Sequence, residues 1–375
     1  MQKKLLSIMS HQDIDHTICM SLIDWQYLYP LLSYQGVTAI VWDKVQSAIN
    51  KGELLKTQQP SSSLKIQWAI NVERIEHKYA AQKLVIAKLA SFFARYNIRM
   101  MILKGYGLSL NYPIPNHRPC GDIDIWLFED VIMPNGDIKR ISAQQKADNL
   151  LREHFQIPID NDKHHHTVFY IDGVMVENHY DFFNIYAHRS NREIEAQLQK
   201  LILDEMEPVE IDDTKIFLPS PDFHALFLLR HSAAHFAAER IGLRHLLDWR
   251  YFIEKYASKI KWQELIDFAH KMNMDKFLHG INAICIDYLG LSNSCIPVLQ
   301  RNIRLERRIL NEILNPEFSE PKPKNANYIT SWSYMIRRWW ANRWKHNIVY
   351  KERLIETFFV QLWSHLLKPK SLRFH

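Results

Sequence analysis

Apolar positions recur along the chain with two periods, which divide it into helical and strand-forming parts. Residues 1–56 follow a helical pattern, and residues 64–96 repeat apolar side chains three or four apart without glycine or proline. Runs of strand length follow at 98–103 and, in period two, at 122–127. The pattern turns helical again from residue 188 to about residue 289, interrupted by one short predicted hairpin.

Turn residues add detail to this outline. Asp172-Gly173 separates two apolar runs within residues 167–180, and Asp-Gly between such runs is a strong signal for a β-hairpin. Residues 209–218 predict a second hairpin, whereas residues 128–136 are predicted to form a loop before a helix at about 141–154.

These elements indicate an α+β fold, in which helical regions at both ends flank a small mixed β-sheet. Two polar, proline-containing stretches, at 57–63 and 316–324, are typical of linkers. The predicted division is a helical region (1–63), a sheet-containing core (64–187), a helical domain over the cleft (188–315), and a linker with a basic tail (316–375).

Asp122 and Asp124 are the first candidates for chemistry. In a strand of period two they share one face, while Ile123 and Ile125 point the other way. Two carboxylates without a basic residue between them repel each other, and a hard cation such as Mg²⁺ would relieve that repulsion. The other interpretation is a solvated strand edge. The upstream turn Lys104-Gly-Tyr-Gly107 favours the metal, because glycines allow close backbone approach to a ligand.

A glycine turn, a short helix and Asp-x-Asp on a strand resemble the DNA polymerase β-type nucleotidyltransferase superfamily. Within it, Leu103-Lys-Gly105, Tyr112-Pro113 and Arg118–Ile125 are similar to the bacterial uncharacterised nucleotidyltransferase family. The sequence departs from the superfamily pattern in its Lys-Gly-Tyr-Gly turn, which replaces Gly-Gly-Ser or Gly-Ser, and in a longer gap before Asp122.

The resemblance implies a third acid on a later strand. Glu177 fits the acid-x-His spelling of the family, in Glu177-Asn178-His179, and Asp181 is the fallback. The alternative is that Glu177 is a surface residue of its strand. On the metal interpretation, two Mg²⁺ ions would be held by Asp122, Asp124 and Glu177.

The same resemblance implies a phosphate site at the turn. Gly105 and Gly107 would bring backbone amides to the β- and γ-phosphates of an NTP, with ATP as the default donor. Lys104 and Arg118 would neutralise its charge, Arg118 through bidentate contact.

Histidines give weaker signals. Adjacent residues of a strand point to opposite faces, so His164-His165-His166 favours a polar strand entry over a metal site, although one ring could face a substrate. A helix is predicted from Ser220-Pro221 onwards. Farther along, His235, Arg244 and Asp248 match the helical half that covers the nucleotide cleft in related families, and a structural network between helices is the other interpretation.

Composition limits the remaining choices. The 375 residues suffice for two or three compact units, and 47% of them are hydrophobic. No apolar run approaches the roughly 20 residues that span a bilayer, and the polar N-terminal segment does not fit a signal peptide. Four scattered cysteines suggest neither zinc nor a disulfide framework, which favours a cytoplasmic setting.

The tail is the most basic part of the chain. Residues 331–375 contain nine Lys or Arg against two Glu, interleaved with tryptophans. Packing against the rest of the chain, peripheral contact with an anionic membrane and nucleic-acid binding are all open, the last being the least favoured. The tryptophans are Trp332, Trp339, Trp340, Trp344 and Trp363.

The sequence therefore predicts a nucleotidyltransferase that moves a nucleoside monophosphate from an NTP to an unidentified hydroxyl acceptor. A small molecule such as an aminoglycoside-like compound or sugar phosphate, a protein side chain and an RNA end all remain open as acceptors, and the oligomeric state is open too. The alternative is a non-catalytic nucleotide-binding or scaffold protein, which the unusual glycine turn supports.

Overall fold

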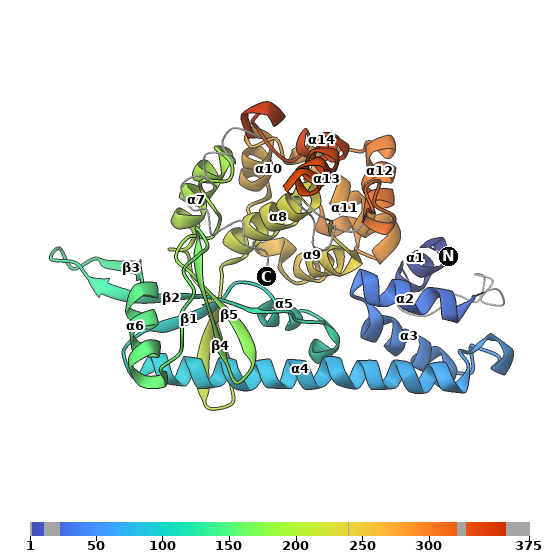
Figure 1. Cartoon of the computed structure of the whole chain (residues 1–375), viewed down its shortest axis with the longest axis horizontal. Coiled ribbons are helices and arrows are strands. Elements are labelled where there is room, and N and C mark those ends of the chain that lie inside the picture. Colours follow the sequence, from blue (N-terminus) through green and yellow to red (C-terminus); the bar gives the residue numbers. More distant parts are fainter. Residues whose placement is uncertain (1, 11–22, 239, 321–327, 358–375) are drawn as a thin grey trace. The chain divides into compact units, whose positions relative to one another are not determined.

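A computed structural model of the chain shows a seven-stranded mixed sheet and many helices, which confirms the predicted α+β fold (Figure 1). It describes residues 2–10, 23–238, 240–320 and 328–357.

Contacts divide the chain into two units. The helical unit contains residues 1–75 and 228–351, and the sheet unit contains residues 76–227 and 352–375. Helices α4 (Ser62–Ala94) and α8 (Pro221–Ala238) contribute residues to both units. The finer four-part division stays a prediction.

The sheet unit is built on the strand order β4-β5-β2-β1-β7-β6, with β3 paired to the far half of β2. The β1–β7 and β2–β5 pairs are parallel, whereas the other pairs are antiparallel. The strands are β1 (Arg99–Ile102), β2 (Ile123–Ile132), β3 (Ile138–Ser142), β4 (His166–Ile171), β5 (Val174–His179), β6 (Glu207–Ile211) and β7 (Thr214–Leu218). The helices wholly within this unit are α5 (Tyr106–Ser109), η3 (Pro115–His117), α6 (Gln144–Phe155) and α7 (Ser190–Leu201).

One face of the sheet forms the hydrophobic core with the C-terminal half of α4 and with α6 (Figure 1). Ile123, Ile125 and Leu127 point into this core, where they meet Leu89 of α4 and Leu151 of α6. Because strand side chains alternate, Asp124 and Trp126 must lie on the opposite face. Periodicity in β2 therefore separates the apolar support from the candidate acids.

Aromatic side chains cover part of that opposite face. Trp126 contacts Phe182, with ring centroids 5.8 Å apart, and Phe182 meets Phe223 of α8 edge-on at 4.8 Å. Helix α7 lies on this side of the sheet and buries Ile194 and Leu198 (Figure 1). The acids thus lie beside an apolar layer, which limits their contact with water.

Both predicted hairpins are confirmed. Strands β4 and β5 pair antiparallel across Asp172-Gly173, whose φ angles are +51° and +77°. Two successive positive φ angles are what a type I′ turn requires. Strands β6 and β7 pair across a turn that contains Asp212, also at positive φ.

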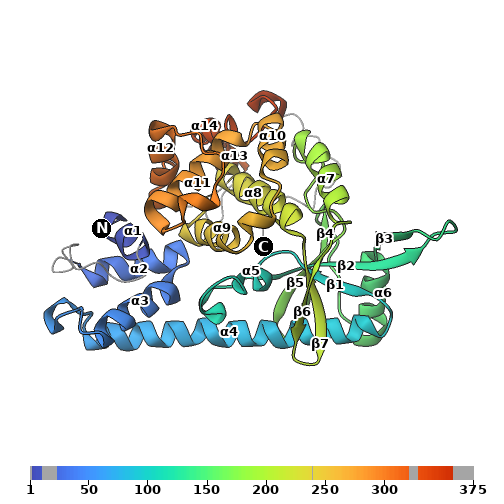
Figure 2. The same cartoon turned by 180° about the vertical axis from the view of Figure 1, so that it is seen from behind.

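The loop predicted at residues 128–136 is wrong. Strand β2 continues to Ile132 and pairs with β3, and the hairpin projects beyond the rest of the sheet (Figure 2). The predicted helix begins only at Gln144. Asn135-Gly136 is itself a favourable turn sequence, and Gly136 has φ +85°, so a hairpin signal was present.

The helical unit packs around Trp68 of α4, which is fully buried. Trp25 and Trp42 surround its ring, and its Nε1 donates to the carbonyl oxygen of Thr38 at 3.0 Å. The other helices are α1 (Gln2–Ser10), α2 (Trp25–Gln35), α3 (Thr38–Asn50), η2 (Lys56–Gln58), α9 (Leu243–Tyr256), η4 (Ala257–Lys259), α10 (Trp262–Lys271), α11 (Asp275–Leu289), η5 (Asn293–Cys295), α12 (Ile303–Leu314), α13 (Tyr328–Ala341) and α14 (Arg343–His346).

The described part of the basic tail is anchored at α14. Trp344 contacts Phe236 edge-on at 5.6 Å, and Lys345 forms a buried ion pair with Glu312 of α12. Burial lowers the pKa of Lys345, and the charge of Glu312 opposes that effect. The tail therefore packs into the helical unit at this point.

Other tail residues are exposed. Ile336 and Trp340 of α13 have exposed fractions of 50% and 59%. The side chain of Trp332 and the whole of Trp363 lie outside the described residues. Within the described ranges, no helix is long and apolar enough to cross a membrane. Membrane-surface contact by residues 331–375 stays a prediction.

We expect Lys345→Met to lower the free energy of unfolding by about 3–5 kcal/mol, because it leaves Glu312 charged and buried without its partner. Urea denaturation measures the change. Arg337→Met is the matched control, since the Arg337–Glu320 pair is exposed and should contribute less than about 1 kcal/mol. Similar losses in the two variants would contradict a stabilising role for the buried pair.

Candidate active site

The turn after β1 forms one wall of the candidate site. Leu103 donates its backbone N–H to the carbonyl oxygen of Asp124 at 3.0 Å, which extends the pairing of β1 with β2. Gly105 then adopts φ +62° and ψ −110°, a conformation that glycine adopts far more easily than other residues. A Cβ at this position would lie 3.3 Å from the carbonyl oxygen of Asp122. Glycine therefore lets the turn approach the start of β2.

The second glycine of the turn has a packing role. Gly107 lies inside the short helix α5, and its N–H donates to the carbonyl oxygen of Lys104. A Cβ there would lie 2.9 Å from Leu218 and 3.3 Å from Ile102. Close packing with β7 accounts for this glycine, and its amide already has a partner.

Asp124 is the central acid. Its side chain is completely buried, and its Oδ1 accepts from Lys104 Nζ at 2.9 Å and lies 3.3 Å from His179 Nε2. Glu177 is its direct neighbour across the parallel β2–β5 pair, where the two Cα atoms are in register. His179 Nε2 lies 3.7 Å from Glu177 Oε2, so one histidine bridges both acids.

This geometry corrects the expectation that the aspartates have no basic partner. Burial lowers the pKa of Lys104, but the charges of Asp124, Asp122 and Glu177 outweigh that effect and raise it. Burial also raises the pKa of Glu177, yet His179 and Lys104 bring it below its usual range. Lys104 and His179 thus supply the positive charge that sequence reasoning assigned to a metal.

Backbone contacts fix the orientation of His179. Its Nδ1 lies 3.2 Å from the carbonyl oxygen of Asp181, which can only accept, so Nδ1 carries a proton and Nε2 faces the acids. Asp181 therefore contributes its backbone to the site. Burial raises the pKa of its carboxyl group, which belongs to neither group of potential metal ligands described below.

Asp122 lies at the bend before β2 and is partly exposed. Helix α4 anchors this segment, because the buried Gln82 donates Nε2 to the carbonyl oxygen of Gly121 at 3.0 Å. Asp122 raises the pKa of Lys104 through its charge. Asp122 therefore interacts electrostatically with the site through Lys104.

Arg118 lies within the loop before β2, and only 4% of its surface is exposed. Its Nη1 donates to the carbonyl oxygen of Pro119 at 3.2 Å and lies 3.3 Å from Cys120 Sγ. A phosphate contact by this guanidinium would require the loop to open.

Two groups of three side chains in the described residues have potential metal-ligand atoms within 4.8 Å of one another. One is Asp124, Glu177 and His179, and the other is His165, His166 and His179. Asp122 belongs to neither group. The sequence pattern predicted Glu177 as a ligand, but it favoured a polar strand entry over a metal site for His165 and His166. The signal for His179 was present, because residues 177 and 179 share one face of a strand.

The other predicted residues lie in the helical unit. His235 of α8 contacts His231 with ring centroids 4.5 Å apart, and Asp248 of α9 is buried. Arg244 of α9 packs against Gly36, whose ideal Cβ position is 3.2 Å from Arg244 Cβ. These three residues belong to a different unit from the acids.

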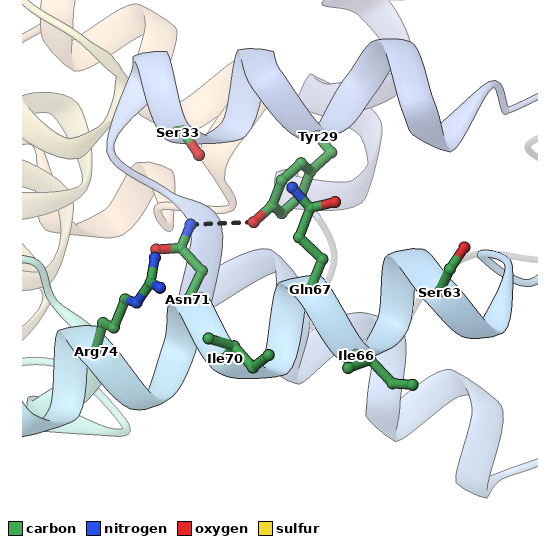
Figure 3. Close-up of a pocket in the computed structure, with 8 residues that line it drawn as sticks. All are labelled: Tyr29, Ser33, Ser63, Ile66, Gln67, Ile70, Asn71 and Arg74. Carbon is green, nitrogen blue, oxygen red and sulfur yellow. Dashed lines mark hydrogen bonds between the residues drawn. The ribbon is translucent and has the colours of Figure 1, made fainter.

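The helical unit also contains an open groove of about 550 Å³ between α2 and α4 (Figure 3). Asn71 Nδ2 donates to Tyr29 Oη at 3.2 Å within it. None of the residues singled out from the sequence lines this groove. The lining residues are Tyr29, Ser33, Ser63, Ile66, Gln67, Ile70, Asn71 and Arg74.

Comparison with known proteins identifies the family. The profile of a family described as uncharacterised nucleotidyltransferase matches residues 21–290. The chain belongs to this family. No curated protein matches it. The crystal structure of an antigenic nucleotidyltransferase-like protein from Paracoccidioides brasiliensis matches at 18% identity over 46% of this chain and 74% of that one, with a TM-score of 0.30.

The matched residues, 21–290, include every residue of the two potential metal-ligand groups. Lys104, Asp124, Glu177 and His179 all lie within the matched residues. Membership of this family indicates a nucleotidyltransferase-like role for the chain.

The pKa of His179 predicts pH-dependent stability. Burial lowers this pKa, but hydrogen bonds and charges from Asp124 and Glu177 raise it to about 9. Because His179 binds its proton more tightly in the folded state, it adds to the free energy of unfolding. This contribution is complete below pH ~6.5 and is lost as pH rises through about 9. We therefore expect His179→Gln to destabilise metal-free protein strongly at about pH 6 and weakly at about pH 10, by urea denaturation.

The exposed His270 provides the control, since His270→Gln should change stability little at either pH. Equal destabilisation by His179→Gln at both pH values would show that the proton of His179 does not stabilise the fold.

Strain at Gly105 gives another prediction. Gly105→Ala should lower the free energy of unfolding by about 1–3 kcal/mol, because alanine resists this backbone conformation and its Cβ crowds Asp122. Gly121→Ala is the matched control, with open space at the Cβ position and no positive φ. The interpretation fails if chemical denaturation finds the two variants equally stable.

Proposed function

We propose that the chain is a metal-dependent nucleotidyltransferase that moves a nucleoside monophosphate from an NTP, by default ATP, to a hydroxyl acceptor. The observation that carries the proposal is the juxtaposition of Asp124 and Glu177 as direct neighbours on parallel strands. Lys104 lies beside them at the end of β1 and Asp122 at the start of β2. Family membership supports the same conclusion.

The donor set fits a divalent cation. Asp124, Glu177 and His179 offer ligand atoms within 4.8 Å of one another, and Asp122 adds an accessible carboxylate nearby. Two magnesium ions held by Asp122, Asp124 and Glu177 would supply charge neutralisation at the triphosphate and activation of the acceptor hydroxyl. The proposal includes membership of the DNA polymerase β-type nucleotidyltransferase superfamily, which the sequence motifs resemble.

Lys104 has the central binding role in this proposal. Its side chain is 20% exposed, so the ammonium group could turn from Asp124 towards a phosphate without leaving the site. Such a turn would free Asp124 Oδ1, which could then serve as a metal ligand. Gly105 keeps the turn free of a side chain, so backbone atoms can approach the triphosphate.

His179 would also have to lose a proton if a cation bound to its ring. In the metal-free protein its imidazolium lies between Asp124 and Glu177. To serve as a metal ligand, Nε2 would have to lose its proton, while Nδ1–H could keep its contact with the carbonyl oxygen of Asp181. His179 therefore contributes positive charge beside the two acids, a role that a bound cation would take over.

A second candidate function is non-catalytic nucleotide binding. The buried Lys104–Asp124 pair favours it, because a carboxylate already neutralised by two bases can stabilise the fold without any metal. On this reading the protein binds nucleotide as a scaffold and transfers nothing. Incubation with α-labelled ATP and cell extract separates the two functions and reveals the acceptor if transfer occurs.

Asp122→Asn provides the sharpest test of catalysis. We expect it to reduce Mg²⁺-dependent label transfer on the order of 100-fold or more, since a lost metal ligand removes several kcal/mol of transition-state stabilisation. Its partial exposure means that folding should be preserved, unlike in Asp124→Asn, which would leave Lys104 and His179 without their buried anion.

Asp137→Asn is the matched control, because Asp137 lies exposed in the β2–β3 turn. It should transfer label at the wild-type rate. Undiminished transfer by Asp122→Asn would eliminate the proposed two-metal arrangement, and wild-type protein that binds ATP but labels nothing would favour the scaffold.

A further inference from the structure

Three histidines gather beside the acids although two of them are adjacent in sequence. His165 precedes β4 and His166 begins it, and His166 is paired directly with His179 of β5. Their ring centroids are 4.2 Å apart for His165–His166, 5.1 Å for His166–His179 and 5.6 Å for His165–His179. Because His165 lies outside the strand, its side chain is free of the alternation that would send it to the opposite face.

The histidine nearest the centre of this group lacks hydrogen bonds. His166 is only 6% exposed, yet neither of its ring nitrogens has a hydrogen-bond partner among the described residues. The Nδ1 atom of His165 is likewise buried and unpartnered. A buried polar atom without a partner costs about 1–3 kcal/mol, and folded proteins normally provide one. Two such imidazoles side by side therefore require a specific reason.

A carboxylate completes the group. Glu177 Oε1 lies 3.6 Å from His166 Nε2, and Glu177 Oε2 lies 3.7 Å from His179 Nε2. The three histidines each offer a nitrogen within 4.8 Å of the others. Ligand atoms about 2.0–2.1 Å from a tetrahedral zinc ion lie ~3.4 Å apart, so the three histidine nitrogens would need to approach one another by at most about 1.4 Å.

We propose that His165, His166, His179 and Glu177 form a binding site for a borderline transition-metal ion such as Zn²⁺. Mg²⁺ prefers an all-oxygen shell and keeps much of its water, whereas imidazole nitrogens suit zinc and its neighbours. Three nitrogens and one carboxylate oxygen are a four-ligand set of the kind that zinc takes. The ion provides His166 with the partner that the described protein atoms do not.

This site deepens and rests on the proposed function, because it shares Glu177 with the proposed magnesium ligands, and its His179 also contacts Asp124. The proposed active site would then bind a second kind of metal ion, because imidazole nitrogens select zinc-like ions whereas carboxylate oxygens select magnesium. The inference itself concerns metal binding, so it can be tested without any nucleotide or acceptor.

Cobalt(II) is a suitable probe, because it occupies zinc sites and its visible spectrum reports nitrogen ligation and tetrahedral geometry. Untagged full-length protein, freed of metal with a chelator, is titrated with Co²⁺ and then with Zn²⁺. We expect one equivalent of Co²⁺ to give an intense visible band that one equivalent of Zn²⁺ removes. Mg²⁺ in large excess should leave the band unchanged.

His166→Ala should weaken Co²⁺ binding on the order of 10–100-fold or more, since it removes one ligand. Removal of an unpartnered imidazole should leave the melting temperature of the metal-free protein nearly unchanged. His165→Ala is a second variant with the same expected loss, in case the first misfolds. His270→Ala is the control, because its ring is 80% exposed and lies outside both ligand groups.

Wild-type protein that binds Co²⁺ no more tightly than His166→Ala would overturn the inference, as would displacement of Co²⁺ by Mg²⁺. Persistent Mg²⁺-dependent transfer in that case would leave the proposed function standing. Conversely, tight Co²⁺ binding by a protein that transfers nothing with any metal would support this site and reject the proposed function.

Discussion

The ion pair between Lys104 and Asp124 is the interaction on which the candidate site depends. Asp124 has no exposed surface, and a buried carboxylate is costly unless positive or hydrogen-bonding groups surround it. Lys104 comes from the turn after β1, Asp124 from β2, and the second base, His179, from the end of β5. One small charge network therefore ties together three neighbouring strands of the sheet at one point.

The rest of the sheet unit supports this network from behind. Helices α4 and α6 fill the opposite face with apolar side chains, and Asn178 donates to the buried Asp148 of α6 at 2.9 Å. Helix α4 also holds the segment before β2 through Gln82. Because Asn178 and Glu177 are adjacent and point to opposite faces, the same short strand anchors the core and presents an acid to the site.

The balance of charge connects stability with function. Lys104 and His179 stabilise the acids, and in the proposed function both would have to release Asp124 when a cation and a triphosphate bind. Their contacts with Asp124 therefore compete with the ligands that the site is proposed to bind. His166 differs from them, because neither of its ring nitrogens has a hydrogen-bond partner among the described residues. His179, which stabilises the acids, is thus paired directly with His166, whose ring nitrogens lack hydrogen-bond partners among the described residues.

The sequence by itself determined the local features. Period-two alternation put Asp124 on the face of β2 opposite Ile123 and Ile125, and it put Glu177 on the same face of β5 as His179. Asp172-Gly173 specified a hairpin, because such patterns depend only on neighbouring residues. Tertiary structure decided which strands became neighbours, and so placed Glu177 opposite Asp124, Lys104 against its carboxylate and His166 opposite His179. These contacts join residues up to 53 positions apart, from Asp124 to Glu177, and local periodicity carries no information about which distant strands will pair.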